Sequence, residues 1–351
     1  MSLVGARSTL AGYMRIAQIN DVASVASELT RGLQSRGHDV TLMQPPLRGA
    51  RLHPFVKPLV GPARAMEWFD MLRELHRGRF ELAHIHYAYL GNVGALGNIP
   101  YILHCHGTDL RESTVFTRPL IRNALLRARH VFYSTPDLAR YVHAVRPDGE
   151  FLPNPIDTSR FTSERPPSEA SDVYICCGLT EVKGVERLYN ACRRLAGQRP
   201  DIRFTAVGDG RFADEFAALP NVTLIPRQER SQLPGIINRH AVVLGQARLG
   251  AIGMAELEAM ACGRPVVTWF NQPHVYAEEP PCIRAVDGYD LAQAVAQLID
   301  NPSLRDSLGS AAREWVGRYH GVDEVVRRVE AVSLRAIAAG RPTRQPVLAS
   351  K

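Results

Sequence analysis

The sequence predicts an α/β protein with two doubly wound parallel sheets, and three observations lead to this prediction. Short apolar runs alternate with amphipathic stretches along most of the chain, an order typical of parallel sheets covered by helices. A segment rich in Pro and Ser, residues 151–171, interrupts the alternation, which then resumes. The length of 351 residues is enough for two ordinary domains.

The first half of the chain predicts the elements of an N-terminal domain. We expect strands at residues 14–20, 39–44, 80–89, 100–107 and 131–136, and helices at 22–38, 65–78 and 118–130. In the first helix, Val25, Leu29 and Leu33 recur four residues apart and form one apolar face. Because periodicity is lost at 151–171, we place the domain at residues 14–160.

The second half predicts a C-terminal domain at residues 170–320. We expect strands at 172–178, 202–210, 222–226, 241–246 and 265–270, and helices at 184–196, from 253 to 262, and in three segments from 289 onward. The helix and tail at 321–351 are expected to pack back on the N-terminal domain. Ligands of open α/β sheets sit beyond the carboxyl ends of the strands, so two such domains facing each other would bind a ligand in a cleft.

Composition indicates a soluble globular protein, with 45% apolar and 22% charged residues. No apolar run approaches the roughly 18 residues of a membrane span. Residues 1–13 lack the apolar core of a secretory signal and precede a second methionine, so we expect a leader or an extension there. The six cysteines form no CxxC pair, and we expect reduced thiols in a cytoplasmic protein.

The positive charge is concentrated in the first half of the chain. Residues 1–165 carry a formal charge of +6, from 20 basic and 14 acidic residues, out of +7 for the whole chain. This balance indicates an acidic partner such as anionic lipid, an acidic glycan or phosphate. The alternative is an arginine-rich protein from a GC-rich genome. We expect no nucleic-acid partner.

A candidate anion site lies at the start of helix 184–196. Lys183 and Gly184 follow a strand and a loop, and a lysine beside the free N–H groups of a helix N-terminus favours an anion. The alternative is a solvated lysine beside a helix cap. The glycine turn at 207–210 is not a GxGxxG fingerprint, so a dinucleotide-dependent dehydrogenase is poorly supported.

The helix that begins at Gly253 carries the strongest signal. It is apolar nearly all round and therefore expected to be buried, yet it contains Glu256 and Glu258, and buried glutamates need partners. The two lie about 200° apart around the helix axis and cannot share a partner. One would pair with an arginine or meet solvent while the other faces a ligand; alternatively, both pair with arginines for structure alone. Gly250 and Gly253 would let backbone N–H groups approach a phosphate closely.

Two histidines, His104 and His106, lie at the end of strand 100–107. We expect their side chains to point to opposite faces of the strand. A histidine at a strand's carboxyl end can act as a donor or a general acid or base, although a structural histidine is the commoner case. The HxH spacing also suggests a metal site, but no third ligand is evident nearby, so we expect no metal.

Seven segments, in one order, resemble the retaining glycosyltransferases of the GT-B fold, family 4. They are RGHDVTL (36–42), HGTDL (106–110), LPNPIDTSRF (152–161), KGVERL (183–188), VGDGRF (207–212), NVTLIPR (221–227) and ELEAMACGRPVV (256–267). The resemblance covers about residues 14–320. It implies two Rossmann-like domains that face a cleft, a nucleotide-sugar donor held mainly by the C-terminal domain, and no cofactor.

The resemblance also implies residue roles. Lys183 would bind the diphosphate, Glu258 the ribose hydroxyls, and His106 would contact the reacting sugar from the acceptor domain. Glu256 receives no role. The phosphates and the sugar would be bound by a stretch of backbone: Gly250, Ala251, Ile252, Gly253 and Met254.

Three positions depart from the family pattern. The first βα loop usually has a glycine pair, and here it has Asn20 and Asp21, which tolerate left-handed backbone better than most residues. Gly178 stands where an arginine usually precedes the lysine by five residues, and Gly250 stands where a glutamate is usual. We expect the replacements to be Arg248 or Arg227 at the diphosphate and Gln246 at the sugar.

The resemblance implies a metal-independent glycosyltransferase that moves a sugar from a nucleotide-diphosphate sugar to an acceptor hydroxyl with retention of configuration, and we expect it to act in cell-surface glycan or glycolipid synthesis. One alternative is a non-catalytic nucleotide-sugar-binding subunit that partners an active glycosyltransferase. Another is a sugar phosphorylase or a nucleotide-sugar epimerase on the same fold. The basic helices at 118–130 and near Arg48–Arg64 could rest on the inner face of an anionic membrane and present a lipid-linked or polysaccharide acceptor, or be plain surface helices.

Overall fold

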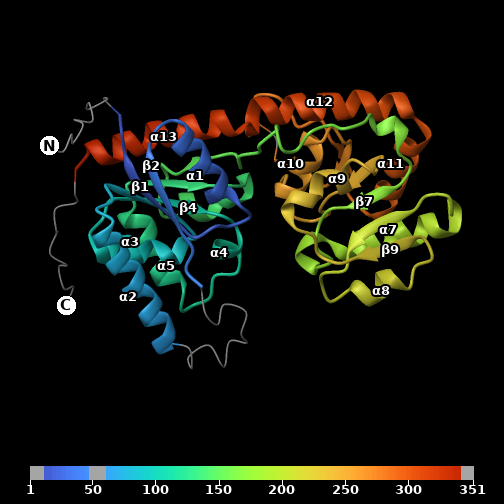
Figure 1. Cartoon of the computed structure of the whole chain (residues 1–351). Coiled ribbons are helices and arrows are strands. Elements are labelled where there is room, and N and C mark those ends of the chain that lie inside the picture. The colour runs from blue at the N-terminus through green and yellow to red at the C-terminus, as the bar shows by residue number, and fades with distance from the viewer. Residues whose placement is uncertain (1–11, 47–60, 273, 341–351) are drawn as a thin grey trace. The chain divides into compact units, whose positions relative to one another are not determined.

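The computed structural model describes residues 12–46, 61–272 and 274–340, and the chain divides into two compact units (Figure 1). The first unit runs to Ser134 and also contains residues 138–152 and the chain from Val325 onward; the second contains 135–137 and 153–324. Each unit is built on a parallel sheet of six strands. The expected leader, apart from its last residues, the tail beyond residue 340, and Arg48 lie outside the described residues.

The first sheet has the strand order β2-β1-β3-β4-β5-β6. Helices α1 and α13 cover one face, and α2, α3 and α5 cover the other (Figure 1). The strands are β1 (Arg15–Ile19), β2 (Asp39–Met43), β3 (Leu82–His86), β4 (Tyr101–Cys105), β5 (His130–Tyr133) and β6 (Glu150–Phe151). The helices are α1 (Val25–Ser35), α2 (Gly61–Arg77), α3 (Gly91–Gly97), α4 (Thr108–Arg111), α5 (Arg118–Arg127), α6 (Ala139–His143) and α13 (Val322–Ala338).

The second sheet has the order β12-β11-β10-β7-β8-β9. Apolar residues of α7 and α11 pack on one face, and those of α9, α10 and α12 pack on the other. The strands are β7 (Val173–Ile175), β8 (Phe204–Val207), β9 (Val222–Ile225), β10 (Val242–Leu244), β11 (Val266–Thr268) and β12 (Ile283–Arg284). The helices are α7 (Val185–Gln198), α8 (Ala213–Ala217), α9 (Leu233–Ile237), α10 (Met254–Ala261), α11 (Gly288–Asp300) and α12 (Pro302–His320).

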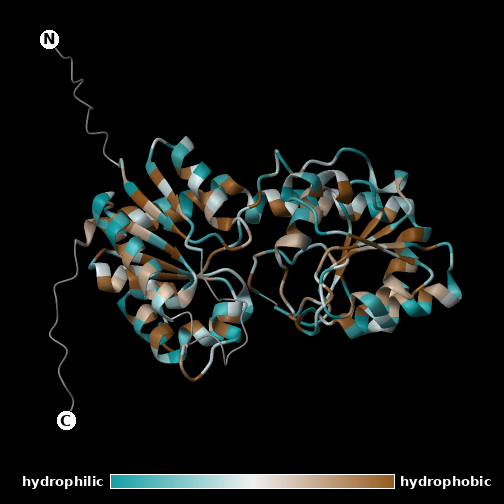
Figure 2. Cartoon of the chain, turned by 60° about the horizontal axis from the view of Figure 1, so that its bottom comes forward, coloured by the Kyte–Doolittle hydropathy of each residue, from teal (hydrophilic) through white to brown (hydrophobic). Residues whose placement is uncertain are grey.

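Buried parallel strands explain the apolar runs in the sequence. Every residue of β3 and β4 is buried, and the strands of both sheets are predominantly hydrophobic in Figure 2. Within the described part of the chain, no helix is both long enough and apolar enough to cross a membrane.

The sequence did not predict several short elements, among them α3. This helix contains Gly91, Gly94 and Gly97, and glycine has low helix propensity. A Cβ at Gly91 would lie 2.8 Å from the Ala124 Cβ, so the glycine lets α3 approach α5 closely. Tertiary packing therefore stabilises a helix that local propensity disfavours.

Candidate functional site

The loop between β10 and α10 is shaped by a fully buried glutamine, Gln246. Its Oε1 accepts hydrogen bonds from the N–H groups of Arg248 at 2.8 Å and Leu249 at 2.5 Å. Its Nε2 donates to the carbonyls of Trp269 at 2.7 Å and Ala251 at 3.0 Å. The whole side-chain amide is thus used to hold this loop, so Gln246 is not placed to contact a sugar, contrary to expectation.

Gly250 in this loop adopts a conformation that favours glycine. Its φ is +72°, and its carbonyl accepts a hydrogen bond from the Asn271 N–H at 3.1 Å. A Cβ at this position would clash with the Asn271 side-chain amide. The glutamate that the family usually has at residue 250 would therefore be strained in this loop conformation.

The two glutamates of α10 are buried and have different partners, as their angular separation requires. Glu256 Oε1 accepts from the backbone N–H of Gln246 at 2.8 Å. Glu258 Oε1 accepts from Arg230 Nε, also at 2.8 Å. Glu256, which the resemblance left without a role, holds the loop between β10 and α10 against its own helix.

Arg230 is a candidate site residue that sequence reasoning missed. It lies 28 residues before Glu258, and its guanidinium carbon stands 5.3 Å from the centre of the Phe161 ring. Local spacing contains no signal for a contact at this separation. The ion pair orients the Glu258 carboxylate, whose residue is only 6% exposed.

Lys183 lies beside the same loop. It ends a 3-10 turn at Glu181–Lys183, and Gly184, with φ +78°, leads into α7. The Lys183 carbonyl accepts from the Ala247 N–H at 2.8 Å, and the Ala247 carbonyl accepts from Arg187 Nη1 at 2.8 Å. Since β7 and β10 are neighbouring parallel strands, the loops that follow them meet at the carboxyl ends of the strands, which we call the sheet edge.

The two arginines expected to replace the missing diphosphate charge lie near this edge. Arg248 Nη1 donates to the Glu181 carbonyl at 3.3 Å, on the turn that carries Lys183. Arg227 Nη1 lies 3.4 Å from Asp209 Oδ2, and its side chain is 79% exposed. Arg248 thus has the closer connection to Lys183.

In the first unit, the first βα loop has left-handed backbone at Asn20, the first of the two positions where the family usually has glycine. Asn20 has φ +69°, and its Nδ2 donates to the His86 carbonyl at 2.7 Å. Asp21 Oδ1 accepts from the Ala26 N–H at 3.0 Å, in the first turn of α1. Asn20 thus adopts a conformation that glycine favours, whereas Asp21 has no positive φ and caps α1 instead.

His106 follows β4, and its backbone is held by a buried aspartate. The Asp109 carboxylate accepts from the N–H groups of His106 at 3.2 Å, Gly107 at 2.7 Å and Ala88 at 2.9 Å. Burial lowers the pKa of His106 to about 3, so its ring is neutral. Its Nε2 lies 2.9 Å from His86 Nδ1.

The structure corrects two expectations about the histidines. The rings of His104 and His106 lie side by side with centroids 4.2 Å apart, so they do not point to opposite faces. The expectation overlooked that alternate residues of an extended chain share a face.

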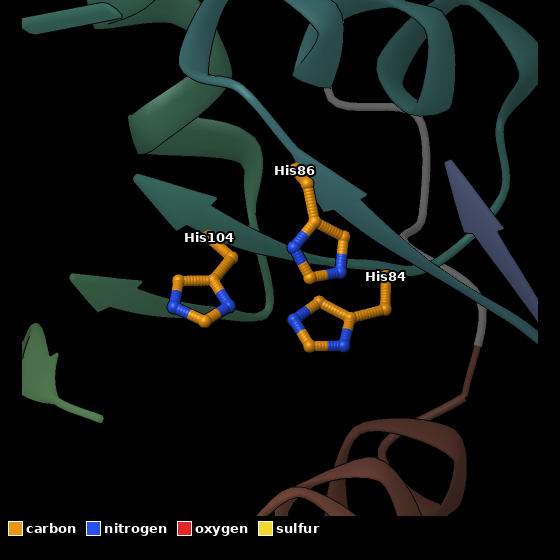
Figure 3. A group of neighbouring side chains, drawn as sticks. All are labelled: His84, His86 and His104. Carbon is orange, nitrogen blue, oxygen red and sulfur yellow. The ribbon is translucent and has the colours of Figure 1, made fainter. Parts of the chain in front are cut away.

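The expectation that no third ligand lies nearby is also wrong, because His84 and His86 of β3 lie beside His104 (Figure 3). The matching HIH pattern at 84–86, in the preceding strand, was the signal that could have found them.

The interior around these histidines contains unsatisfied polar atoms. Both ring nitrogens of His84 and of His104 are buried without a hydrogen-bond partner. Burial lowers the pKa of His84 to about 3 and shifts those of His86 and His104 well below the usual value. Each unsatisfied buried donor or acceptor costs about 1–3 kcal/mol.

Solved structures identify the fold of the chain. Sucrose-phosphate synthase from Thermosynechococcus elongatus superimposes with a TM-score of 0.75 over 93% of this chain and 100% of that one, at 16% identity. HepE of Anabaena, in complex with UDP-glucose, superimposes with a TM-score of 0.72 over 92% of this chain and 100% of that one, also at 16% identity. At these identities the likeness establishes the fold, which is the GT-B fold of glycosyltransferases.

Family models assign the chain within this class. Residues 22–160 match the model described as Glycosyltransferase Family 4, and residues 161–315 match Glycosyl transferases group 1. The chain belongs to family 4 of the glycosyltransferases.

Two curated relatives use GDP-mannose. A GDP-mannose-dependent monoacylated alpha-(1-6)-phosphatidylinositol monomannoside mannosyltransferase of Corynebacterium glutamicum is 26% identical over 48% of this chain, a match that spans only 52% of that relative. A GDP-mannose-dependent alpha-(1-6)-phosphatidylinositol monomannoside mannosyltransferase of Mycolicibacterium smegmatis is 26% identical over 67% of this chain and 69% of its own length.

Proposed function

We propose that this protein transfers a sugar from a nucleotide-diphosphate sugar to an acceptor hydroxyl, with retention of anomeric configuration. The observation that carries the proposal is the hydrogen bond between Ala247 and Lys183, which joins two loops at one sheet edge. The joined loops gather a lysine, a glycine-rich backbone and the N-termini of α7 and α10. Cations and helix N-termini stabilise negative charge, which develops on a departing nucleoside diphosphate.

Individual residues receive roles in this proposal. Lys183, with Arg248 beside it and Arg227 near Asp209, offsets the diphosphate charge, so the transfer needs no metal there. Glu258, held by Arg230, accepts hydrogen bonds from the ribose hydroxyls, for which a carboxylate is a good acceptor. The backbone at Gly250–Met254 contacts the phosphates and the sugar. His106, from the first unit, contacts the reacting sugar.

The acceptor is proposed to be a lipid-linked glycan at the inner face of an anionic membrane. The two GDP-mannose-dependent relatives carry names that specify phosphatidylinositol mannosides, which supports a glycolipid acceptor. The first unit has a cavity of about 460 Å³ between α2, α3 and α5, lined partly by Phe69, Leu96 and Leu120. These side chains are 65%, 64% and 44% exposed, respectively. Arg118 and Arg122 add exposed positive charge on α5.

A thermal-shift panel tests the donor site. We expect GDP, UDP or ADP at about 100 times its dissociation constant to stabilise the wild type by about 2.7 kcal/mol, and Lys183→Ala and Glu258→Ala to remove the effect. Glu314→Ala, at an exposed position on α12, is the control and should respond like the wild type.

The turnover assay uses the sugar nucleotide whose base binds. Transfer to a glycolipid acceptor with retained configuration supports the proposal. Binding without turnover on any acceptor favours the non-catalytic subunit instead. No shift with any nucleotide would refute the donor site.

A further inference from the structure

We propose that His84, His86 and His104 form a buried site for one divalent transition-metal ion such as Zn²⁺, with one ring nitrogen of each histidine as a ligand. The three residues belong to neighbouring strands, and the register of β3 and β4 pairs His86 directly with His104. Because alternate residues of a strand share a face, His84 joins them on the same side of the sheet. One candidate ligand atom of each histidine lies within 4.8 Å of the other two.

The nitrogens of His84 and His104 are available to a metal. Both side chains are fully buried, and neither ring has a hydrogen-bond partner at Nδ1 or Nε2. Figure 3 shows one nitrogen of each ring directed into the space that the three rings share.

A neighbouring glutamine selects the ligand atom of His86. Its Nε2 lies 2.7 Å from Gln18 Oε1, an acceptor, so Nε2 donates and Nδ1 is the acceptor nitrogen, which in the metal-free structure lies 2.9 Å from His106 Nε2. Histidine ligands of metals commonly donate their other ring N–H to such an acceptor, which fixes the tautomer and the ring orientation. In Figure 3 this Nδ1 faces the side on which His104 lies.

The donor set indicates which ions the site would bind. Three imidazoles suit Zn²⁺, Cu²⁺ or Ni²⁺, whereas Ca²⁺ and Mg²⁺ prefer oxygen ligands. Zn–N bonds of about 2.0–2.1 Å place tetrahedral ligands about 3.3 Å apart, so small ring rotations must bring the nitrogens closer. His106 Nε2 is 2.9 Å from His86 Nδ1, so metal binding would replace this hydrogen bond and change how His106 is held.

Metal uptake by the untagged full-length protein tests the proposal without any substitution. After removal of metals, we expect one Zn²⁺ per chain at micromolar free zinc, and Co²⁺ to give the visible absorption of a nitrogen-ligated tetrahedral ion. ¹⁵N NMR of the imidazoles should show metal-dependent shifts in the three ligand histidines and a smaller shift in His106, whose hydrogen bond to His86 is replaced. If the wild type binds no zinc at about 100 µM, where a ligand with micromolar affinity saturates, the proposal is overturned and ordered water occupies the space.

Matched variants locate the ion. His84→Leu and His104→Leu should weaken zinc binding at least 100-fold, and Gln18→Ala about 10–100-fold. His240→Leu removes a buried histidine of the second unit, and His76→Gln removes an exposed one; both should bind like the wild type. Unchanged zinc binding in folded His84→Leu would contradict the proposal. If the leucine variants do not fold, the imidazole shifts of the wild type decide the question.

Discussion

Glu256 accepts a hydrogen bond from the backbone N–H of Gln246 at 2.8 Å. The first turn of α10 therefore fixes Gln246, whose side chain holds the loop between β10 and α10. Gln246 in turn binds the backbone of Arg248, Leu249 and Ala251. A single buried carboxylate therefore stabilises the loop that is proposed to contact the donor phosphates.

Two substitutions of Glu256 distinguish the contribution of its hydrogen bond to stability from the contribution of its charge. Glu256→Ala leaves the buried Gln246 N–H without a partner and opens a cavity, so we expect the free energy of unfolding to fall by about 2–4 kcal/mol. Glu256→Gln keeps an oxygen acceptor and should lose less than about 1.5 kcal/mol. Urea denaturation measures both, with Glu314→Ala as the exposed control. Equal losses in the two variants would show that the hydrogen bond is not the stabilising feature.

Restoring a side chain at Gly250 should destabilise the loop. Gly250→Ala forces a Cβ into left-handed backbone and against Asn271, and we expect a loss of about 1–3 kcal/mol. Gly250→Glu, which restores the family residue, should not raise nucleotide affinity. The control is Gly197→Ala in α7, where a Cβ meets nothing within 4 Å and should stabilise the helix by about 0.5–1 kcal/mol.

The partner of Gly250 provides a second test of the same clash. Asn271→Ala should recover part of the loss in the Gly250→Ala background, because it removes the clashing amide but not the backbone strain. A double-mutant cycle measures this coupling. Strict additivity of the two substitutions would contradict the clash.

The two parallel sheets were predictable because buried parallel strands appear in the sequence as predominantly apolar runs, such as IAQI at residues 16–19, each followed by a helical segment. Contacts distant in sequence were not predictable, since neither Arg230 with Glu258 nor Asn271 with Gly250 leaves a local pattern. The histidine cluster was predictable in part, because HIH and HCH occupy consecutive strands. The sequence interpretation missed it because it placed the side chains of His104 and His106 on opposite faces of the strand, whereas alternate residues of a strand share a face.

His320 should make stability depend on pH. Its Nδ1 lies 2.9 Å from the Asn154 carbonyl and its Nε2 lies 3.0 Å from the Tyr276 hydroxyl, and burial lowers its pKa to about 4. In the unfolded chain the pKa is about 6.5, so the unfolded state binds more protons between these values. The contribution of neutral His320 is therefore complete above about pH 6.5 and is lost as pH falls through about 4.

Urea denaturation at two pH values measures this contribution. Between about pH 7.5 and pH 5, the wild type should lose about 2 kcal/mol more stability than His320→Gln. The exposed control His76→Gln should retain the wild-type dependence. The assignment to His320 fails if the glutamine variant has the same pH dependence as the wild type.

Membrane binding should depend on the outer face of α2, α3 and α5. We expect the protein to float with vesicles that contain anionic phosphatidylglycerol and to bind vesicles of neutral phosphatidylcholine weakly, because basic residues contribute about 1 kcal/mol each near an anionic surface. Arg118→Gln with Arg122→Gln should reduce binding about tenfold or more. Phe69→Ser with Leu96→Ser should also weaken it, because exposed apolar side chains insert at the lipid interface.

Leu334→Ser on α13, where Leu334 is 39% exposed, is the control for membrane binding and should bind like the wild type. Equal binding to both vesicle types, or unchanged binding in both double variants, would assign these helices to the ordinary protein surface.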